Sequence, residues 1–269
     1  MQFAKPWIKV KREGPPMTVR SGPRTIQYAA VTHKGLVRER NEDAVLAAET
    51  ILKGNNASHS GAVSGTGRPV FMIADGMGGH ARGEVASSCA LECLKGDIDR
   101  FDDTDWGARI LHADHEIFNL MERRPELTGM GTTLVGVEVG RSSLVVFNVG
   151  DSRAYRFGHG KLMQATVDDV PERCFDQAWR SHQITQALGG RPKPGRLFPH
   201  VRAQDPLGDD EKLLLCSDGL WDMLPDTIIC RILQEEVDVQ AAANALLQAA
   251  LEAGGEDNVS VIVVGFGSG

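Results

Sequence analysis

The stretch Val70-Phe-Met-Ile-Ala-Asp-Gly-Met-Gly-Gly-His80 joins five apolar residues to an aspartate and a cluster of glycines. A short apolar run bounded by turn residues is typical of a strand that is buried on both faces. The sequence therefore predicts a strand over Val70–Ala74 that ends at Asp75, then a turn, then a helix over Glu84–Lys95. In the turn, we expect glycine to permit a positive φ and to let the Gly76 carbonyl face a cation.

The same arrangement recurs along the chain. Four more aspartates lie at the ends of predicted strands: Asp43, Asp151, Asp218 and Asp257. A single aspartate beside a strand is usually a turn former. Five carboxylates that converged on one rim would repel one another unless cations neutralised them. Oxygen ligands of this kind select Mg²⁺ or Mn²⁺, and two such ions can activate water and clamp a phosphoryl group.

A charged segment lies upstream of this turn. Arg38-Glu-Arg-Asn-Glu-Asp43 places two guanidinium groups beside three acids. Such a run is ordinarily a solvated turn. The alternative is that one arginine binds a phosphate through two hydrogen bonds while an acid faces the cations. We favour the alternative because the predicted Asp75 site would lie nearby.

Predicted strands outnumber predicted helices and occur in groups. Further strands are expected at Thr25–Thr32, Ala44–Ala48, Thr132–Val139, Ser143–Val149, Arg153–Phe157, His200–Ala203, Lys212–Cys216 and Val259–Phe266, the last as an edge or closing strand. Further helices are expected at Trp106–Arg123, Asp226–Glu236 and Val239–Ala253, a Gly/Ser-rich loop at 53–68 and irregular structure at 168–198. Grouped strands favour packed sheets with helices outside them over a doubly wound parallel sheet.

The first 24 residues differ from the rest of the chain. They carry six Lys and Arg residues, one Glu and four prolines. This composition is typical of a poorly ordered arm, and docking to an acidic partner is the alternative. Because no linker is evident after residue 25, we expect a basic arm over residues 1–24 and a single domain over residues 25–269.

Composition excludes several classes of protein. The formal net charge of −7 over 269 residues disfavours a nucleic-acid binder. No apolar run approaches the roughly 18 residues of a membrane span, and the start of the chain lacks the apolar stretch of a secretory signal. The five cysteines form no C-x-x-C pair, which disfavours a disulfide framework or a zinc site. We expect a cytoplasmic monomer.

Seven segments, taken together, resemble the metal-dependent PP2C (PPM) family of serine/threonine protein phosphatases, in its bacterial form. They follow the family order over about residues 26–266: Arg38-Glu-Arg-Asn-Glu-Asp43, Asp75-Gly-Met-Gly-Gly79, Gly131-Thr-Thr133, Val149-Gly-Asp-Ser-Arg153, Ile184-Thr-Gln-Ala-Leu-Gly189, Leu215-Cys-Ser-Asp-Gly219 and Gly255-Glu-Asp-Asn-Val-Ser-Val261. The resemblance implies an α+β fold, in which a central antiparallel β-sandwich is flanked by helices on both outer faces in four layers, αββα.

The resemblance also implies a ligand set for two Mn²⁺ or Mg²⁺ ions. Asp75 would bridge both ions, and the Gly76 carbonyl would complete one site. Asp218 and Asp257 would bind the other ion. Asp151 matches a residue that, beside Asp218, helps to bind a third ion in bacterial members.

Other residues match the family less directly. Arg38 corresponds to the phosphate-binding arginine, and Glu42 and Asp43 would lie around the ions, Glu42 through water. Met77 stands where animal members have a histidine, so a side-chain general acid is absent at that position. The family's Thr-x-Asp-His-Ser segment is Thr166-Val-Asp-Asp-Val170 here, and the flap that follows is short.

The activity implied is hydrolysis of phosphoserine and phosphothreonine on proteins by water activated between two ions, with Arg38, Asp75 and Asp218 as catalytic residues. Expected partners are phosphorylated proteins, including a serine/threonine kinase or its targets. One alternative is a small-molecule phosphoesterase with the same ions. Another is a non-catalytic regulatory binding module on the same fold, which the retained acids disfavour.

Three further residues invite a chemical role without strong support. His112 and His115 lie on one predicted helix and are interpreted as surface or packing residues. Cys216 lies next to Ser217-Asp218, but burial in a strand raises the pKa of a thiol and makes it inert.

Overall fold

The computed structural model describes residues 25–64, 67–78, 82–100, 105–171 and 183–267. The basic arm expected over residues 1–24 lies outside them, as do His80 and Cys174.

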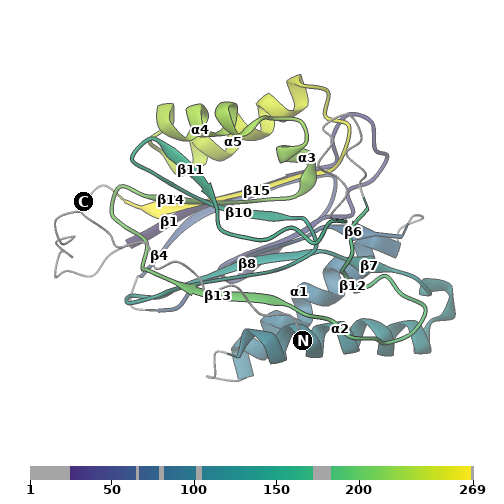
Figure 1. Ribbon diagram of the computed structural model, residues 1–269. Coiled ribbons are helices and arrows are strands. Elements are labelled where there is room, and N and C mark those ends of the chain that lie inside the picture. The colour runs from purple at the N-terminus through teal and green to yellow at the C-terminus, as the bar shows by residue number, and fades with distance from the viewer. Residues whose placement is uncertain (1–24, 65–66, 79–81, 101–104, 172–182, 268–269) are drawn as a thin grey trace.

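Two six-stranded antiparallel sheets form the centre of the molecule (Figure 1). The first sheet has the order β11 (Lys161–Gln164), β10 (Arg153–Gly158), β14 (Lys212–Cys216), β15 (Val259–Phe266), β1 (Thr25–His33) and β4 (Asn56–Ser64). The second has the order β13 (His200–Gln204), β9 (Leu144–Val149), β8 (Leu134–Val139), β5 (Val70–Ala74), β2 (Ala44–Ala47) and β3 (Thr50–Leu52). A small third sheet joins β12 (Leu188–Gly189), β7 (Gly131–Thr132) and β6 (Gly76–Met77).

Helices cover both outer faces of the sandwich (Figure 1). The second sheet packs against α1 (Arg82–Arg100) and α2 (Trp106–Arg123), and the 3₁₀ turn η1 (Pro125–Leu127) follows α2. The first sheet packs against α4 (Asp226–Glu235) and α5 (Val239–Glu252), and the short α3 (Asp218–Trp221) follows β14 directly. The predicted four-layer αββα sandwich is therefore confirmed.

Strand β5 shows why the apolar runs are continuous. Phe71 and Ile73 lie in the core between the two sheets, whereas Val70, Met72 and Ala74 face the core under α1 and α2. All five are at most 5% exposed. Because both faces of the strand are buried, each larger side chain contributes about 1.5–3 kcal/mol of burial free energy. The first polar residue, Asp75, comes directly after the strand.

Three expectations about strands are wrong. The segment 168–198, expected to be irregular, contains the short strand β12. The predicted Gly/Ser-rich loop at 53–68 contains β4, which pairs antiparallel with β1 and sets Ser60 opposite Ala29. Its side chains alternate between exposed and half-buried positions, as on an edge strand. Backbone pairing with β1 therefore outweighs the low strand propensity of glycine and serine. The final strand, β15, lies between β14 and β1 and is central.

Helix α1 begins in backbone contact with the turn that follows Asp75. A Cβ atom on Gly83 would lie 2.6 Å from the Gly76 carbonyl carbon, and one on Gly76 would lie 2.2 Å from the Gly83 carbonyl oxygen. Within this turn, Gly78 has the expected positive φ, at 134°, whereas Gly76 is not among the glycines with positive φ. Close approach of two backbone segments requires glycine here.

We expect Gly83→Ala to destabilise the protein by about 1–3 kcal/mol, because the new methyl group overpacks this contact. Gly96 is the matched control, since it lies in the same helix and a Cβ atom added there would meet no atom within 4 Å. Gly96→Ala should instead raise the free energy of unfolding by about 0.5–1 kcal/mol. Urea denaturation of both variants measures the difference, and equal effects would contradict the packing argument.

Candidate active site

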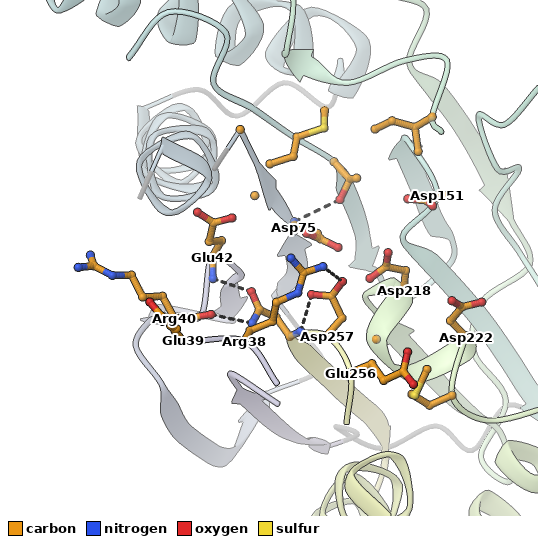
Figure 2. Close-up of a pocket in the computed structure, with 18 residues that line it drawn as sticks. Arg38, Glu39, Arg40, Glu42, Asp75, Asp151, Asp218, Asp222, Glu256 and Asp257 are labelled. Carbon is orange, nitrogen blue, oxygen red and sulfur yellow. Dashed lines mark hydrogen bonds and ion pairs between the residues drawn. The ribbon is translucent and has the colours of Figure 1, made fainter. Parts of the chain in front are cut away.

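A cavity of about 990 Å³ lies at the end of the sandwich where both sheets terminate. Figure 2 shows its acidic lining, with Asp75, Asp151, Asp218 and Asp257 directed toward a common space. Asp75 directly follows β5 and Asp151 follows β9, and both of these strands belong to the second sheet. In the first sheet, Asp218 opens α3 after β14, and Asp257 precedes β15. Packing of the two sheets brings together acids that are far apart in sequence.

The fifth predicted acid, Asp43, lies beneath the cavity and not on its wall. It is 1% exposed, and its Oδ2 accepts hydrogen bonds from Ser217 Oγ at 2.9 Å and Ser260 Oγ at 2.6 Å. Its Oδ1 is also buried and has no hydrogen-bond partner among the described residues. An orphaned buried carboxylate oxygen costs free energy unless a cation or a proton compensates it.

Burial and mutual repulsion strongly raise the pKa values of the acids. Burial, followed by the charges of Asp43 and Asp218, raises the pKa of Asp75 well above its usual value. Burial raises the pKa of Asp43 to about 7, and burial together with the nearby Asp218 raises that of Asp151 to about 7. Ionising the cluster is therefore unfavourable without a cation. The donors are all oxygen atoms, which fits the hard ions Mn²⁺ and Mg²⁺.

Two threonines, one in β7 and one directly after it, fix the backbone of Asp75. Thr132 Oγ1 and the Thr133 amide both donate to the Asp75 carbonyl at 2.9 Å, and the Asp75 amide donates to Thr133 Oγ1 at 3.2 Å. Thr133 Oγ1 also lies 2.7 Å from Ser152 Oγ, next to Asp151. These hydrogen bonds fix the positions of Asp75 and Asp151 relative to each other and leave both carboxylates unused.

Asn258 organises the segment that carries Arg38 and Glu42. Its Oδ1 accepts a hydrogen bond from the Glu42 amide at 2.8 Å, and its Nδ2 donates to the carbonyls of Lys34 at 3.0 Å and Arg40 at 2.8 Å. Glu42 lines the cavity, and burial raises the pKa of its carboxyl group although Arg38 opposes the shift. The segment is therefore tied to the chain immediately after Asp257.

Arg38 reaches into the cavity and donates a hydrogen bond from its guanidinium to Asp257 Oδ2 at 2.6 Å (Figure 2). Its side chain is 57% exposed, so this ion pair is solvated on one side. A cation bound at Asp257 would compete with the guanidinium for the same carboxylate. Arg40 lines the same cavity and contributes its backbone carbonyl to the Asn258 contact.

The segment that departs from the family pattern is well anchored. The Arg153 guanidinium donates hydrogen bonds to both carboxylate oxygens of Asp168, and the shortest is 2.7 Å. Asp169 accepts hydrogen bonds from the Gly150 amide at 2.9 Å and from His200 at 3.0 Å. The residue that stands in place of the pattern's histidine is thus an aspartate paired with a histidine from β13, and it supports the backbone just before Asp151.

Sequence reasoning missed the residues that position the acids. They are Thr132, Thr133, Ser217, Asn258 and Ser260, together with Asp222, which lines the cavity. Most of them lie inside the family-like segments, but no local pattern assigns hydrogen bonds across more than 40 residues. The interpretation of Cys216 agrees with the structure, because burial strongly raises the pKa of its thiol.

Fold and cavity define a metallophosphatase-like sandwich, and comparison with known proteins gives the family. The crystal structure of the catalytic domain of the serine/threonine phosphatase PstP in complex with two manganese ions superimposes with a TM-score of 0.74 at 33% identity, covering 91% of this chain and all of that one. Serine/threonine protein phosphatase PstP of Mycobacterium tuberculosis is 33% identical over 88% of this chain.

Serine/threonine phosphatase stp of Listeria monocytogenes is 32% identical, over 73% of this chain and 84% of its own length. The family profile described as Protein phosphatase 2C matches residues 190–259. The chain belongs to the protein phosphatase 2C family. It spans 44% of the length of the mycobacterial PstP sequence. Among the described residues, no helix has the length and apolarity needed to cross a membrane.

The raised pKa of Asp151 predicts how the metal-free protein responds to pH. Because its pKa rises from 3.8 to about 7 on folding, the folded state binds this proton more tightly than the unfolded state. The free energy of unfolding should therefore fall as pH rises from about 4 to about 7. Asp151→Asn cannot ionise at this position and therefore avoids this loss of unfolding free energy. At pH 8 in the presence of a chelator, the variant should have a higher melting temperature than the parent protein, by about 2–4 °C for each kcal/mol regained.

Near pH 4 the melting temperatures of the variant and the parent protein should agree. Exposed Asp210 gives the matched control, and Asp210→Asn should leave the melting temperature unchanged at both pH values. A lower melting temperature for Asp151→Asn at pH 8 would contradict the electrostatic argument.

Proposed function

We propose that the protein is a Mn²⁺- or Mg²⁺-dependent phosphatase that hydrolyses phosphoserine and phosphothreonine on proteins. The observation that carries this proposal is the convergence of four carboxylates from two sheets beside one arginine in a single cavity. Membership of the protein phosphatase 2C family supports it, as does the serine/threonine phosphatase activity for which the PstP and stp relatives are named.

We assign ligands for the ions from the residues that line the cavity, because their candidate donor atoms are all oxygens. Asp75 would contact both ions, with the Gly76 carbonyl at one of them, and Asp218 and Asp257 would hold the other. Asp151 would take part in a third site together with Asp218. The negative charge of Asp218 contributes to the raised pKa of Asp151, so the two carboxylates lie close together. Glu42 on the cavity wall and Asp43 beneath it would complete the negative surroundings. When bound, such ions supply an activated water and neutralise charge on the phosphoryl group.

The side chains of the protein would bind and orient the phosphate. Arg38 lies beside the acids with a half-exposed guanidinium, and that group can bind a phosphate through two charge-assisted hydrogen bonds. An ion on Asp257 would take over the charge that Arg38 now compensates, which frees the guanidinium for the substrate. Met77 lines the cavity and carries no titratable group, so no acid acts from that position.

A protein substrate is favoured by the surface next to Arg38. Leu36 and Val37 are 62% and 67% exposed, and together they present apolar side chains that a peptide could cover. We propose phosphorylated proteins, including a serine/threonine kinase or its targets, as partners of a monomer with one domain after the basic arm. The four described cysteines are free, which supports a reducing compartment such as the cytoplasm.

Activity should require added Mn²⁺ or Mg²⁺ and disappear in EDTA. Asp75→Asn should lower kcat by at least about 10³, equivalent to about 4 kcal/mol in the barrier, because it removes charge from both ion sites. Asp151→Asn should retain binding of two Mn²⁺ ions in calorimetry and lose less activity. Asp210→Asn is the surface control. Full activity of Asp75→Asn, or of the parent protein in EDTA, would rule out the proposed ligand set.

Arg38→Ala should lower kcat/KM by about 10² on a phosphopeptide, because one charge-assisted contact to the transition state is lost. Arg40 is the matched control, since it lines the same cavity but is placed only through its backbone carbonyl. Arg40→Ala should change kcat/KM less than threefold, a difference of about 0.6 kcal/mol. If Arg40→Ala were the inactive variant, the assignment of Arg38 to phosphate would be wrong. Parallel assays with sugar phosphates would distinguish a small-molecule phosphoesterase.

A further inference from the structure

A second cluster of metal-ligating side chains lies between α1 and α2, away from the acidic cavity. Cys93 and Asp97 are one turn apart on α1, and His112 on α2 faces both of them. The ligand atoms of the three residues all lie within 4.8 Å of one another. No local sequence motif predicts this cluster, because its members come from two helices that become neighbours only in the folded protein.

The distances suit one small ion. His112 Nδ1 lies 3.6 Å from Cys93 Sγ and 2.8 Å from Asp97 Oδ2. In a tetrahedral zinc site with Zn–S of about 2.3 Å and Zn–N of about 2.0 Å, sulfur and nitrogen are separated by about 3.5 Å. The cysteine–histidine pair already has this separation. The carboxylate needs to move away from the ring by about half an ångström, to the ligand–ligand separation of such a site.

Burial and charge at the cluster also favour a cation. The Asp97 side chain is only 7% exposed, and its Oδ2 lies 2.8 Å from His112 Nδ1. The three residues line a groove of about 830 Å³ whose wall carries four carboxylates and two basic side chains. One of the basic side chains, Lys53, is already paired with Glu92 at 2.6 Å. The groove is therefore negative around a buried acid.

The same surroundings raise the pKa of the Cys93 thiol. Burial, followed by the charge of Asp97, raises its pKa to about 12. Without a cation, Cys93 stays protonated at neutral pH. A bound divalent ion favours the thiolate and releases its proton, so ion binding and deprotonation are coupled.

We propose that Cys93, Asp97 and His112 form a zinc-binding site that links α1 to α2. Thiolate, imidazole and carboxylate together select Zn²⁺ over Mg²⁺ and Mn²⁺, which prefer oxygen ligands alone. Water would take the fourth position. The site is separate from the proposed phosphatase centre and does not depend on it. The proposal departs from two expectations, that cysteine spacing disfavours zinc and that His112 is a surface or packing residue, because the ligands are adjacent in space and not in a C-x-x-C motif.

Cobalt titration of the full chain tests the proposal. Co²⁺ bound to a thiolate gives a near-ultraviolet sulfur-to-metal charge-transfer band, whereas Co²⁺ bound to carboxylates in the acidic cavity gives none. At saturation, we expect the band intensity of one thiolate-bound Co²⁺ per chain. Added Zn²⁺ should remove it, and added Mg²⁺ should not. Binding should also strengthen as pH rises, because Cys93 must lose its proton.

Matched variants identify the ligands. Cys93→Ala and His112→Ala should each abolish the band. Cys230→Ala and His115→Ala should preserve it, because Cys230 lies on α4 and the exposed His115 lies outside the cluster. His112 is half exposed, so its removal leaves the core intact, and circular dichroism checks the fold of each variant.

Absence of the band in the parent protein would overturn the proposal. Persistence of the band in Cys93→Ala would overturn it as well, since the thiolate would then belong to another cysteine. Persistence in His112→Ala would also overturn it, because His112 would then not be a ligand. Phosphatase activity is a separate measurement, and loss of the band leaves the assignment of the acidic cavity untouched.

Discussion

Electrostatic repulsion among buried carboxylates governs the chemistry of the cavity at the end of the sandwich. Strand ends from two sheets carry Asp75, Asp151, Asp218 and Asp257 to one cavity, and Asp43 lies beneath it with an oxygen that has no partner among the described residues. Burial and neighbouring charge raise the pKa of three of these groups. A rigid sandwich that holds them together has a strong affinity for cations, because neutralising them removes a cost that folding has already incurred.

Holding the acids in place is the work of their neutral neighbours. Thr132 and Thr133 bind the backbone of Asp75, and Asn258 binds the backbone on either side of Arg38. Each hydrogen bond contributes only about 0.5–1.5 kcal/mol, yet together they fix the positions of charged groups that would otherwise move apart. Because these contacts use backbone atoms, the carboxylates and the guanidinium remain available for ions and substrate.

Helix α1 connects the acidic cavity to the second cluster. Its first turn places Gly83 against the turn after Asp75, and Ser87 donates a hydrogen bond to the Glu42 carbonyl at 2.6 Å. Further along, Cys93 lies on the face of α1 that meets α2. An ion between the two helices would therefore restrain the same helix on which the Asp75 turn packs.

The central strands and the acids at their ends can be predicted from the order of the residues alone. Val70–Ala74 is predicted with its observed bounds, because burial on both faces leaves a continuous apolar run. Features that rest on long-range contacts could not be predicted in this way, because they depend on how the chain packs. Strand β4 is rich in glycine and serine and exists through pairing with β1. Arg38 meets Asp257 across 219 positions, and Cys93 meets His112 from another helix. Local patterns record which faces of a segment are buried, whereas the packing of sheets and helices decides which side chains become neighbours.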